Sequence, residues 1–316
     1  MKKKQGNNTE YLFNSKIKNG LLFGVVVLIV IAAYFFGASK NVNMWNDSFT
    51  LLDPARGLVN QKDLIVNIQP LRDSINIEYE NDKDISVYFE YLPTGANISL
   101  NKDAEFYPAS LLKVPVAMAV AKKIEQGEWK WSNELVLMPT DKDNKFGTLY
   151  KEPSNSKFTI EEIVRRSLSD SDNSAHFILV RNLEMNEMND VYDHMGLDGF
   201  LKTEGSLSAK KYSVMMRALY AASYLSEENS QKLLKYLSQS PFSQYVQQGL
   251  PDDVTFAHKI GVDDDRKVYL DSGIIYTKGR PYLLTVMTKN KNYETAQKIM
   301  ADISKKAYNY VSDYEE

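Results

Sequence analysis

The chain has 316 residues, of which 43% are hydrophobic, and a net charge of −3 at pH 7. A chain of this length can bury the core of one large globular domain or of two small ones. Its charge gives no sign of a nucleic-acid partner, and the absence of cysteine excludes thiol catalysis and cysteine-ligated metal. The three histidines are widely spaced and form no His-Glu-x-x-His pattern, so the sequence predicts neither a zinc hydrolase nor any other cofactor.

An uncharged apolar run at 21–38 is the first predicted element, and it is long enough to cross the hydrocarbon core of a membrane as a helix. Lysines outnumber acidic residues before it, which predicts 1–20 as a cytoplasmic segment and 21–39 as a single-pass transmembrane anchor in the cell membrane. The rest of the chain is then extracytoplasmic. A cleaved secretory signal, with Gly37-Ala38-Ser39 at the peptidase site, stays open as the alternative. In both cases the folded part is exported.

The stretch 40–84 is mixed and polar, and it predicts a stalk followed by a packing helix, with apolar residues at helical spacing from Pro70 onward. The period then changes to strand-like alternation over 85–92 and 96–100. A Pro-Thr-Gly turn between these two runs predicts a hairpin. The hairpin leads into an apolar helix that begins near Ser110, so the folded domain starts with two strands and a helix.

The next part of the chain, 127–250, is mainly helical by its spacing and its polar connections. Helices are expected there at 160–168, 173–181, 188–194, 209–225 and 228–237. Strand character returns at 254–262, 267–276 and 282–288, before a closing helix at 293–311. This order predicts an α+β fold (an α/β sandwich), in which a five-stranded antiparallel sheet is flanked by helices and carries an inserted all-helical subdomain. The predicted domain spans 85–311.

Ser110 and Lys113 stand one helical turn apart at the start of the first apolar helix. Side chains at i and i+3 are neighbours, so the lysine amine can help to deprotonate the hydroxyl, and a helix N-terminus favours developing negative charge. The same Ser-x-x-Lys spacing also occurs at 15–18, 154–157 and 208–211. The first of these lies on the cytoplasmic side, the second in a polar loop, and the third fits a helix N-cap. Ser110 therefore remains as the candidate nucleophile.

Two further motifs follow. Ser171-Asp172-Asn173 occurs once in the chain, and Lys259-Ile260-Gly261 lies on the first late strand. With these motifs the chain resembles class A β-lactamases and penicillin-binding proteins, whose signature is Ser-x-x-Lys, Ser-Asp-Asn and Lys-Thr-Gly in that order. The resemblance covers about 85–311 and implies a serine hydrolase that hydrolyses an amide or β-lactam through an acyl-enzyme; with the anchor predicted at 21–39, the enzyme is expected to be membrane-anchored. It implies a β-lactam or a peptidoglycan stem peptide as the partner, and we expect a monomer.

The resemblance implies a catalytic role for three of the motif residues. Ser110 attacks the carbonyl carbon and becomes acylated, while Lys113 acts as general base or relay. Ser171 passes a proton to the leaving nitrogen, and none of these steps requires a metal. Each residue also has a plain structural interpretation, as a helix cap or a solvated lysine, so it is the combination of motifs in order that favours catalysis.

Four other residues are implied to bind substrate. Asn173 holds the substrate amide, Lys259 supplies positive charge for proton relay and for a substrate carboxylate, and Gly261 leaves the strand edge open to a substrate backbone. The backbone N–H groups of the nucleophile and of Val262 form the oxyanion hole. One such donor is worth about 3 to 4 kcal/mol in well-studied enzymes.

Two departures from the family pattern bear on the reaction. Ile260 replaces the threonine or serine of the third motif, which removes a hydroxyl that would bond a substrate carboxylate. In the loop 196–209, Glu204 only partly matches the Glu-x-x-Leu-Asn pattern of class A enzymes, in which the glutamate activates the deacylating water. A D,D-carboxypeptidase acting on peptidoglycan stem peptides therefore stays open beside the lactamase. So does a non-catalytic cell-wall binding module with the same fold.

Two more polar residues near the third motif have plain expected roles. His258 is expected to serve in packing or in a backbone hydrogen bond, because a Ser–Lys arrangement needs no histidine. Arg266 could bind a substrate carboxylate. An exposed turn arginine is the favoured interpretation, because it follows three consecutive aspartates.

Overall fold

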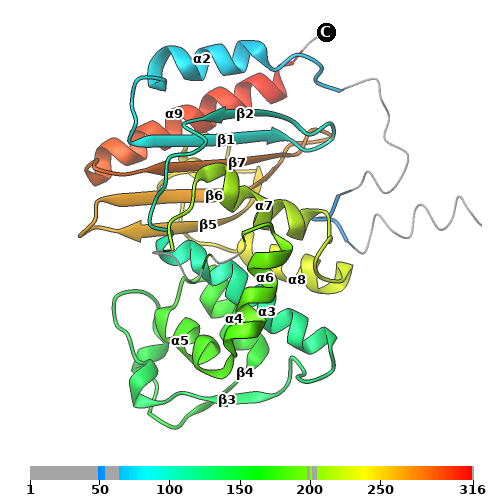
Figure 1. Ribbon diagram of the computed structural model, residues 1–316, viewed down its shortest axis with the longest axis vertical. Coiled ribbons are helices and arrows are strands. Elements are labelled where there is room, and N and C mark those ends of the chain that lie inside the picture. Colours follow the sequence, from blue (N-terminus) through cyan, green and yellow to red (C-terminus); the bar gives the residue numbers. More distant parts are fainter. Residues whose placement is uncertain (1–48, 54–63, 198–199, 201–204, 315–316) are drawn as a thin grey trace, which may run out of the picture. The chain divides into compact units, whose positions relative to one another are not determined.

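Five antiparallel strands form one sheet in the computed structural model (Figure 1). Their order across the sheet is β2-β1-β7-β6-β5, so the first hairpin of the domain lies beside its last strand. The strands are β1 Ile85–Tyr91, β2 Ala96–Leu100, β5 Thr255–Asp263, β6 Val268–Tyr276 and β7 Tyr282–Thr288. The strand that carries the third motif, β5, lies at one edge of this order, where another segment or a ligand can approach its backbone.

The structure describes residues 49–53, 64–197, 200 and 205–314. Residues 51–316 group as one unit, to which all elements named below belong. The predicted cytoplasmic segment, the anchor at 21–39 and part of the stalk lie outside the described ranges, as does Glu204. Within those ranges, no helix is both long enough and apolar enough to cross a membrane.

Helices cover both faces of the sheet (Figure 1). On one face lie α2 (Gln69–Tyr79) and α9 (Tyr293–Ser312), which also contact each other, and α7 (Ala209–Tyr220) packs on the other. In α9 the buried residues recur every three or four positions, as expected for a helix with one face on a core. The core between the sheet, α2 and α9 includes Ile75, Phe89, Ile260, Leu284 and Ile303.

Between β2 and β5 the chain forms the predicted helical block, to which α7 also belongs. Among the described residues, its other helices are α3 Lys113–Glu125, α4 Ile160–Ser169, α5 Asn173–Asn182, α6 Met185–His194 and α8 Glu227–Leu237, with 3-10 turns at η3 Ala109–Leu112, η4 Pro139–Asp141, η5 Leu149–Lys151 and η7 Val246–Gly249. The central helix is α3, because it is buried all round from Lys113 to Ala121 and contacts α4, α5, α6 and α8. A helix buried on every side belongs to the interior of a domain.

The prediction of an all-helical insertion is wrong in one place. Within it, β3 (Glu134–Val136) and β4 (Lys157–Thr159) pair antiparallel as a two-stranded sheet. Thr159 then caps α4, since its hydroxyl accepts a hydrogen bond from Glu162 N at 3.2 Å. Runs of three residues are too short to show strand alternation in a sequence, so this pairing depends on contacts made in the folded chain.

Most predicted boundaries agree with the structure to within a few residues, and α7 differs most. It is predicted to reach 225 but ends at Tyr220, because Ala222 adopts a φ of 45°, a left-handed conformation that closes a helix. The start of α6 also differs from the prediction, because this helix begins at Met185 rather than at 188. There Glu187 accepts a hydrogen bond from Glu184 N at 2.7 Å, which satisfies a donor at the helix start that the apolar pattern does not reveal.

Candidate active site

Ser110 lies in the tight turn η3, and the regular helix α3 begins three residues later at Lys113. Lys113 Nζ donates to Ser110 Oγ at 2.7 Å, so the structure brings the two side chains of the first motif into contact. Ala109, just before the serine, has a φ of 45°, a conformation that costs a non-glycine residue about 1–3 kcal/mol. A hydrogen bond from α7 stabilises this turn: the buried Tyr212 hydroxyl donates to Leu111 O at 3.0 Å.

Lys113 is enclosed by protein and by hydrogen-bond partners. It is only 2% exposed. Its Nζ donates to Asn173 Oδ1 at 2.7 Å and lies 3.5 Å from Ser171 Oγ. Burial lowers the pKa of Lys113 to about 8, against the raising effect of the Asp172 and Asp143 carboxylates. Because this pKa is close to neutral pH, part of the protein population carries Lys113 as an uncharged amine, and this form can accept the proton of the Ser110 hydroxyl.

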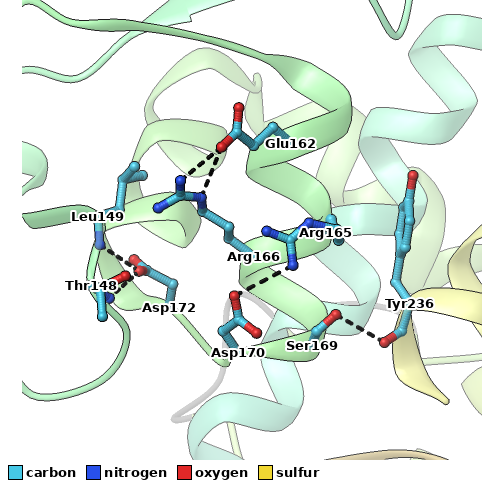
Figure 2. Close-up of polar contacts among 9 residues, drawn as sticks. All are labelled: Thr148, Leu149, Glu162, Arg165, Arg166, Ser169, Asp170, Asp172 and Tyr236. Atoms are coloured by element: carbon cyan, nitrogen blue, oxygen red, sulfur yellow. Dashed lines mark hydrogen bonds and ion pairs between the residues drawn. The ribbon is translucent and has the colours of Figure 1, made fainter. Parts of the chain in front are cut away.

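The motifs predict no catalytic or binding role for Asp172, and the structure shows its carboxylate accepting hydrogen bonds from the backbone, two of which Figure 2 shows. It caps α5, since its Oδ1 accepts a hydrogen bond from Ala175 N at 2.9 Å. Its Oδ2 accepts from the backbone N–H groups of Thr148 and Leu149, at 2.7 and 2.8 Å. Gly147 permits this approach, because its φ is 86° and a Cβ there would lie 2.1 Å from Asp172 Oδ2.

Asp172→Ala is expected to lower the free energy of unfolding by about 3 kcal/mol, because three backbone N–H groups lose a charged acceptor at once. Urea unfolding followed by circular dichroism measures the loss. Asp170→Ala is the matched control (Figure 2). Asp170 pairs with Arg165 at 3.5 Å and both side chains are partly exposed, so its removal should change stability by less than about 1 kcal/mol. Equal losses in the two variants would contradict the role given to Asp172.

The other two residues of the second motif face the catalytic amine. Asn173 accepts from Lys113 through Oδ1 and donates through Nδ2 to Asp143 Oδ1 at 2.9 Å. An amide NH₂ group carries two hydrogens, so Asn173 keeps one donor for the predicted contact with a substrate amide. Ser171 is 1% exposed, and its position 3.5 Å from Lys113 Nζ suits the predicted transfer of a proton to a leaving nitrogen.

Lys259, in the third motif, is buried without a hydrogen-bond partner among the described residues. It is 1% exposed, and its Nζ lies 5.8 Å from the centroid of the Phe242 ring. Burial and the charge of Lys113 lower the pKa of Lys259 well below its ordinary value, while the Asp271 and Asp170 carboxylates act in the opposite direction. A substrate group that accepts a hydrogen bond from this amine would satisfy a donor that the protein leaves unpaired.

Gly261 allows β5 to lie against the nucleophile turn. A Cβ at this position would be 3.0 Å from Pro108 O and 3.3 Å from Leu111 Cγ, tighter than an ordinary contact. Val262 follows on the same edge strand and is partly buried, so the two donors predicted for the oxyanion hole come from segments in contact. Ile260 is 1% exposed and belongs to the core cluster that includes residues of α9. An apolar core side chain therefore stands where the third motif of the family has a hydroxyl.

Glu204, the candidate deacylation base, lies outside the described residues. Shortly after it, Leu207 pairs with Phe106 through two backbone hydrogen bonds of 2.9 Å each. The chain after Glu204 is thereby tied to the segment that leads into the nucleophile turn. Ser208 accepts a hydrogen bond from Lys211 N at 3.3 Å as the cap of α7, which confirms the N-cap interpretation of this Ser-x-x-Lys match.

His258 is buried and stacks on the Phe256 ring at a centroid distance of 4.1 Å, as expected for a packing residue, but its hydrogen-bond partner is a carboxylate rather than the backbone. Its Nδ1 lies 2.8 Å from Asp271 Oδ1, and both side chains are buried. Arg266 is an exposed turn arginine, as expected. It donates to Asp263 Oδ2 at 2.8 Å, and its guanidinium lies 4.2 Å from the centroid of the Tyr107 ring. In the described part of the chain, no group of three or more histidine, aspartate or glutamate residues could hold a metal ion.

Comparison with known proteins gives matches of three kinds. The model of the beta-lactamase enzyme family matches residues 70–311. Beta-lactamase VEB-1 of Pseudomonas aeruginosa is 26% identical over 157 residues, which are 49% of this chain and only 45% of that protein. The solved structure of PBP-A has a TM-score of 0.71 at 22% identity, covering 78% of this chain and 97% of that one. A β-lactamase from Sphaerobacter thermophilus has a TM-score of 0.70 at 21% identity, covering 79% and 100%.

These matches carry different weights. At such low identity the two solved structures establish the fold alone, and the curated relative is matched over less than half of its length. The family model covers more of this sequence than the curated relative does: its range begins in α2, ends in α9 and includes all three motifs. On that coverage, and with the first two motifs in hydrogen-bond contact and the third strand packed against the nucleophile turn, the chain belongs to the beta-lactamase enzyme family.

Proposed function

We propose that the chain is an extracytoplasmic serine hydrolase of class A β-lactamase type, which hydrolyses a cyclic amide through an acyl-enzyme at Ser110. The observation that carries the proposal is the 2.7 Å contact between Lys113 Nζ and Ser110 Oγ, in surroundings that lower the pKa of the lysine to about 8. A base whose pKa lies near the working pH is suited to deprotonate a serine hydroxyl. Family membership supports the same class of reaction.

Acylation begins when Ser110 Oγ attacks the carbonyl carbon and its proton moves to Lys113 Nζ. The charge that develops on the carbonyl oxygen is received by the backbone N–H groups of Ser110 and Val262. The C–N bond then breaks as the nitrogen takes a proton from Ser171 Oγ, which is resupplied from Lys113 Nζ 3.5 Å away. The product is an ester of Ser110 with the opened substrate. Addition of water to the ester carbonyl releases the acid and restores the serine.

Two residues would orient the substrate for this attack. Lys259 would receive a substrate carboxylate, because its buried amine has no partner among the described residues. Asn173 would donate its remaining amide hydrogen to the substrate, since its other polar positions bond Lys113 and Asp143. Both contacts add to the rate only as far as they hold the carbonyl carbon over Ser110 Oγ.

A D,D-carboxypeptidase of peptidoglycan stem peptides is the second candidate, and the connection from α6 to α7 favours it. α6 ends at His194, α7 begins at Ala209, and Leu207 is already paired with Phe106. The stretch between the end of α6 and Leu207 is short for a loop that must position both a glutamate and a deacylating water beside Ser110. A mutant of PBP-A has been solved as an acyl-enzyme complex with penicillin G, and we expect a comparable adduct at Ser110.

Incubation of residues 43–316 with a chromogenic cephalosporin, followed by colour and by intact mass, separates these functions. Repeated turnover supports the lactamase, and a persistent stoichiometric adduct supports the peptidase, whose release of D-alanine from a stem peptide is then measured. If neither an adduct nor turnover appears, and Ser110→Ala behaves like the wild type, acylation of Ser110 by lactams is refuted. A non-catalytic cell-wall binding module is then favoured, since Ile260 lacks the hydroxyl of the third motif.

Glu204→Gln is expected to slow deacylation and to leave acylation nearly unchanged, if this residue activates the second water. The reason is that an amide keeps the size of the side chain but accepts no proton. Stopped-flow measurement of adduct formation, combined with the decay of the adduct by mass spectrometry, resolves the two steps. An unchanged decay rate would assign Glu204 to the surface and leave deacylation without this base.

The proposed location is the outer face of the cell membrane, with 21–39 as the anchor. The uncharged run at 21–38 and the lysines before it support this placement. Full chain and residues 43–316 should separate on membrane fractionation, with only the full chain in the pellet after a high-salt wash. Recovery of a mature chain that lacks the first residues would favour the cleaved signal instead.

A further inference from the structure

The side-chain amide of Asn173 lies between a lysine amine and a carboxylate. Its Oδ1 accepts a hydrogen bond from Lys113 Nζ at 2.7 Å, and its Nδ2 donates to Asp143 Oδ1 at 2.9 Å. The oxygen and the nitrogen of an amide are similar in size, so a half-turn about the last side-chain bond would exchange them with little change of shape. The reaction described above needs one of the two orientations, with the oxygen toward Lys113 and an amide hydrogen toward the substrate.

The chemistry of the two neighbours selects this orientation. An ammonium group can only donate and an ionised carboxylate can only accept, so both neighbours orient the amide in the same way while Lys113 is charged. A neutral amine can also accept a hydrogen bond through its lone pair. Lys113 acts as the base in its neutral form. At that stage, of these two neighbours, only the Asp143 carboxylate still requires the NH₂ group of Asn173 to face it.

The start of α5 also fixes the backbone of Asp143. Asp143 N donates to Ser174 Oγ at 2.9 Å, and Ser174 Oγ donates to Asp143 O at 3.2 Å. Ser174 is fully buried and directly follows Asn173 in the chain. The same carboxylate oxygen that binds the amide, Asp143 Oδ1, also accepts from Lys145 N at 2.9 Å. Backbone and side-chain contacts together therefore hold this oxygen at the Asn173 amide.

Asp143 also acts on Lys113 through its charge. Burial lowers the pKa of Lys113 to about 8, while the Asp172 and Asp143 carboxylates raise it. Lys259 and His176 interact with the same amine, since the charge of Lys113 lowers the pKa values of both. A substitution at 143 can remove one charge and leave the other three groups unchanged. The hydrogen bond of the carboxylate and its charge can therefore be tested separately.

We propose that Asp143 is a positioning residue: it accepts a hydrogen bond from Asn173 Nδ2 and thereby keeps the Asn173 amide oriented while Lys113 is the neutral base. The amide oxygen then stays directed at the lysine amine, and the second amide hydrogen stays directed at the substrate. The effect on the rate rests on the proposed acyl-enzyme at Ser110. The hydrogen bond from Asn173 to Asp143 does not, so the two can fail separately.

Asp143→Asn and Asp143→Ala separate the two effects of the carboxylate. Both remove the charge, which lowers the pKa of Lys113, so the rising limb of the acylation rate should move to lower pH by about half a unit in both. The side-chain oxygen of asparagine can still accept from Asn173, so the plateau rate of Asp143→Asn should stay within about threefold of the wild type. Asp143→Ala offers no acceptor, and its plateau should fall about 10-fold to 100-fold.

Intact mass of the full chain in detergent gives the acylation rate with a chromogenic cephalosporin between about pH 5 and 10. A wild-type plateau in Asp143→Ala would overturn the proposal. So would an equal loss of the plateau in both variants, because the retained acceptor would then make no difference. A limb that moves in both variants while neither plateau falls would reduce Asp143 to a charge and would also overturn it.

Asp141→Asn is the control for losing a buried carboxylate from the same segment. Asp141 is 2% exposed, and it accepts from Arg181 Nε and from Met138 N, each at 2.8 Å. Its substitution should lower the free energy of unfolding, because the guanidinium loses a charged partner, but it should leave the limb and the plateau of the acylation rate at their wild-type values. A plateau loss as large as that of Asp143→Ala would count against the proposal.

Hydrogen exchange of the Asn173 NH₂ group tests the contact without any reaction. Nitrogen NMR of the full chain in detergent, with isotope-labelled asparagine, follows the two side-chain hydrogens, and Asn173→Asp identifies their signals. The hydrogen donated to Asp143 should exchange with water at least about 10-fold more slowly in the wild type than in Asp143→Ala. Equal rates would overturn the proposal even if acylation proceeds normally. If the protection is present and no lactam acylates Ser110, the proposed function fails and the contact of Asp143 with Asn173 stands.

Discussion

Ser110→Ala should leave a folded protein that no lactam can acylate, with the acylation rate lower by at least about 1,000-fold. Alanine has no oxygen to form the ester, while the lysine at 2.7 Å and the rest of the site stay in place. The measurement is intact mass after incubation with a penicillin. The wild type, sampled before the ester is hydrolysed, should gain the mass of one lactam molecule, and the variant none. An adduct of unchanged stoichiometry on the variant would place the nucleophile elsewhere.

Ser208→Ala is the matched control, because Ser208 begins another Ser-x-x-Lys match. Its hydroxyl accepts a hydrogen bond from Lys211 N at 3.3 Å and caps α7. Its loss should lower the free energy of unfolding by about 1 kcal/mol and leave acylation at the wild-type rate. Opposite effects in the two variants would show that spacing alone does not make a serine reactive and that the surroundings of the lysine do.

Lys113→Arg should slow acylation by about 100-fold to 10,000-fold. An arginine keeps the positive charge but cannot be deprotonated in a protein, so it cannot accept the proton of Ser110. The pKa of Lys113 is about 8, and the active base is its neutral form. The wild-type rate should therefore rise with pH through about 8, and the variant should lose this rise. The value of kcat/KM between about pH 5 and 10 measures both effects.

Lys122→Arg provides the comparison for this substitution. Lys122 lies on the same helix, is partly exposed, and donates to Tyr224 O at 2.8 Å away from the motifs. Its replacement should change neither the rate nor its pH dependence. If Lys113→Arg kept the rising limb of the wild type, another group would have to be the base, and the role of Lys113 would be reduced to positioning.

The order of strands and helices could be predicted because their signals are local. The hairpin β1–β2 shows alternation on both sides of a Pro-Thr-Gly turn, and α9 has a buried residue at every turn after the Asn292 cap. The N-cap role of Asp172 could also be predicted from the sequence, because an aspartate directly before a helix is a common N-cap. The pairing of β3 with β4 was not, because strands of three residues leave no periodic pattern.

The amino-acid sequence specifies the three motifs, their order, and the elements on which they stand, because periodicity, turns and caps involve residues close together in the chain. Only the folded structure decides how these groups behave. It buries Lys113 until its pKa is about 8, leaves the buried Lys259 Nζ without a hydrogen-bond partner among the described residues, and packs Ile260 into the core. Desolvation and charge at each of these positions come from residues far apart in the chain, so they exist only after folding.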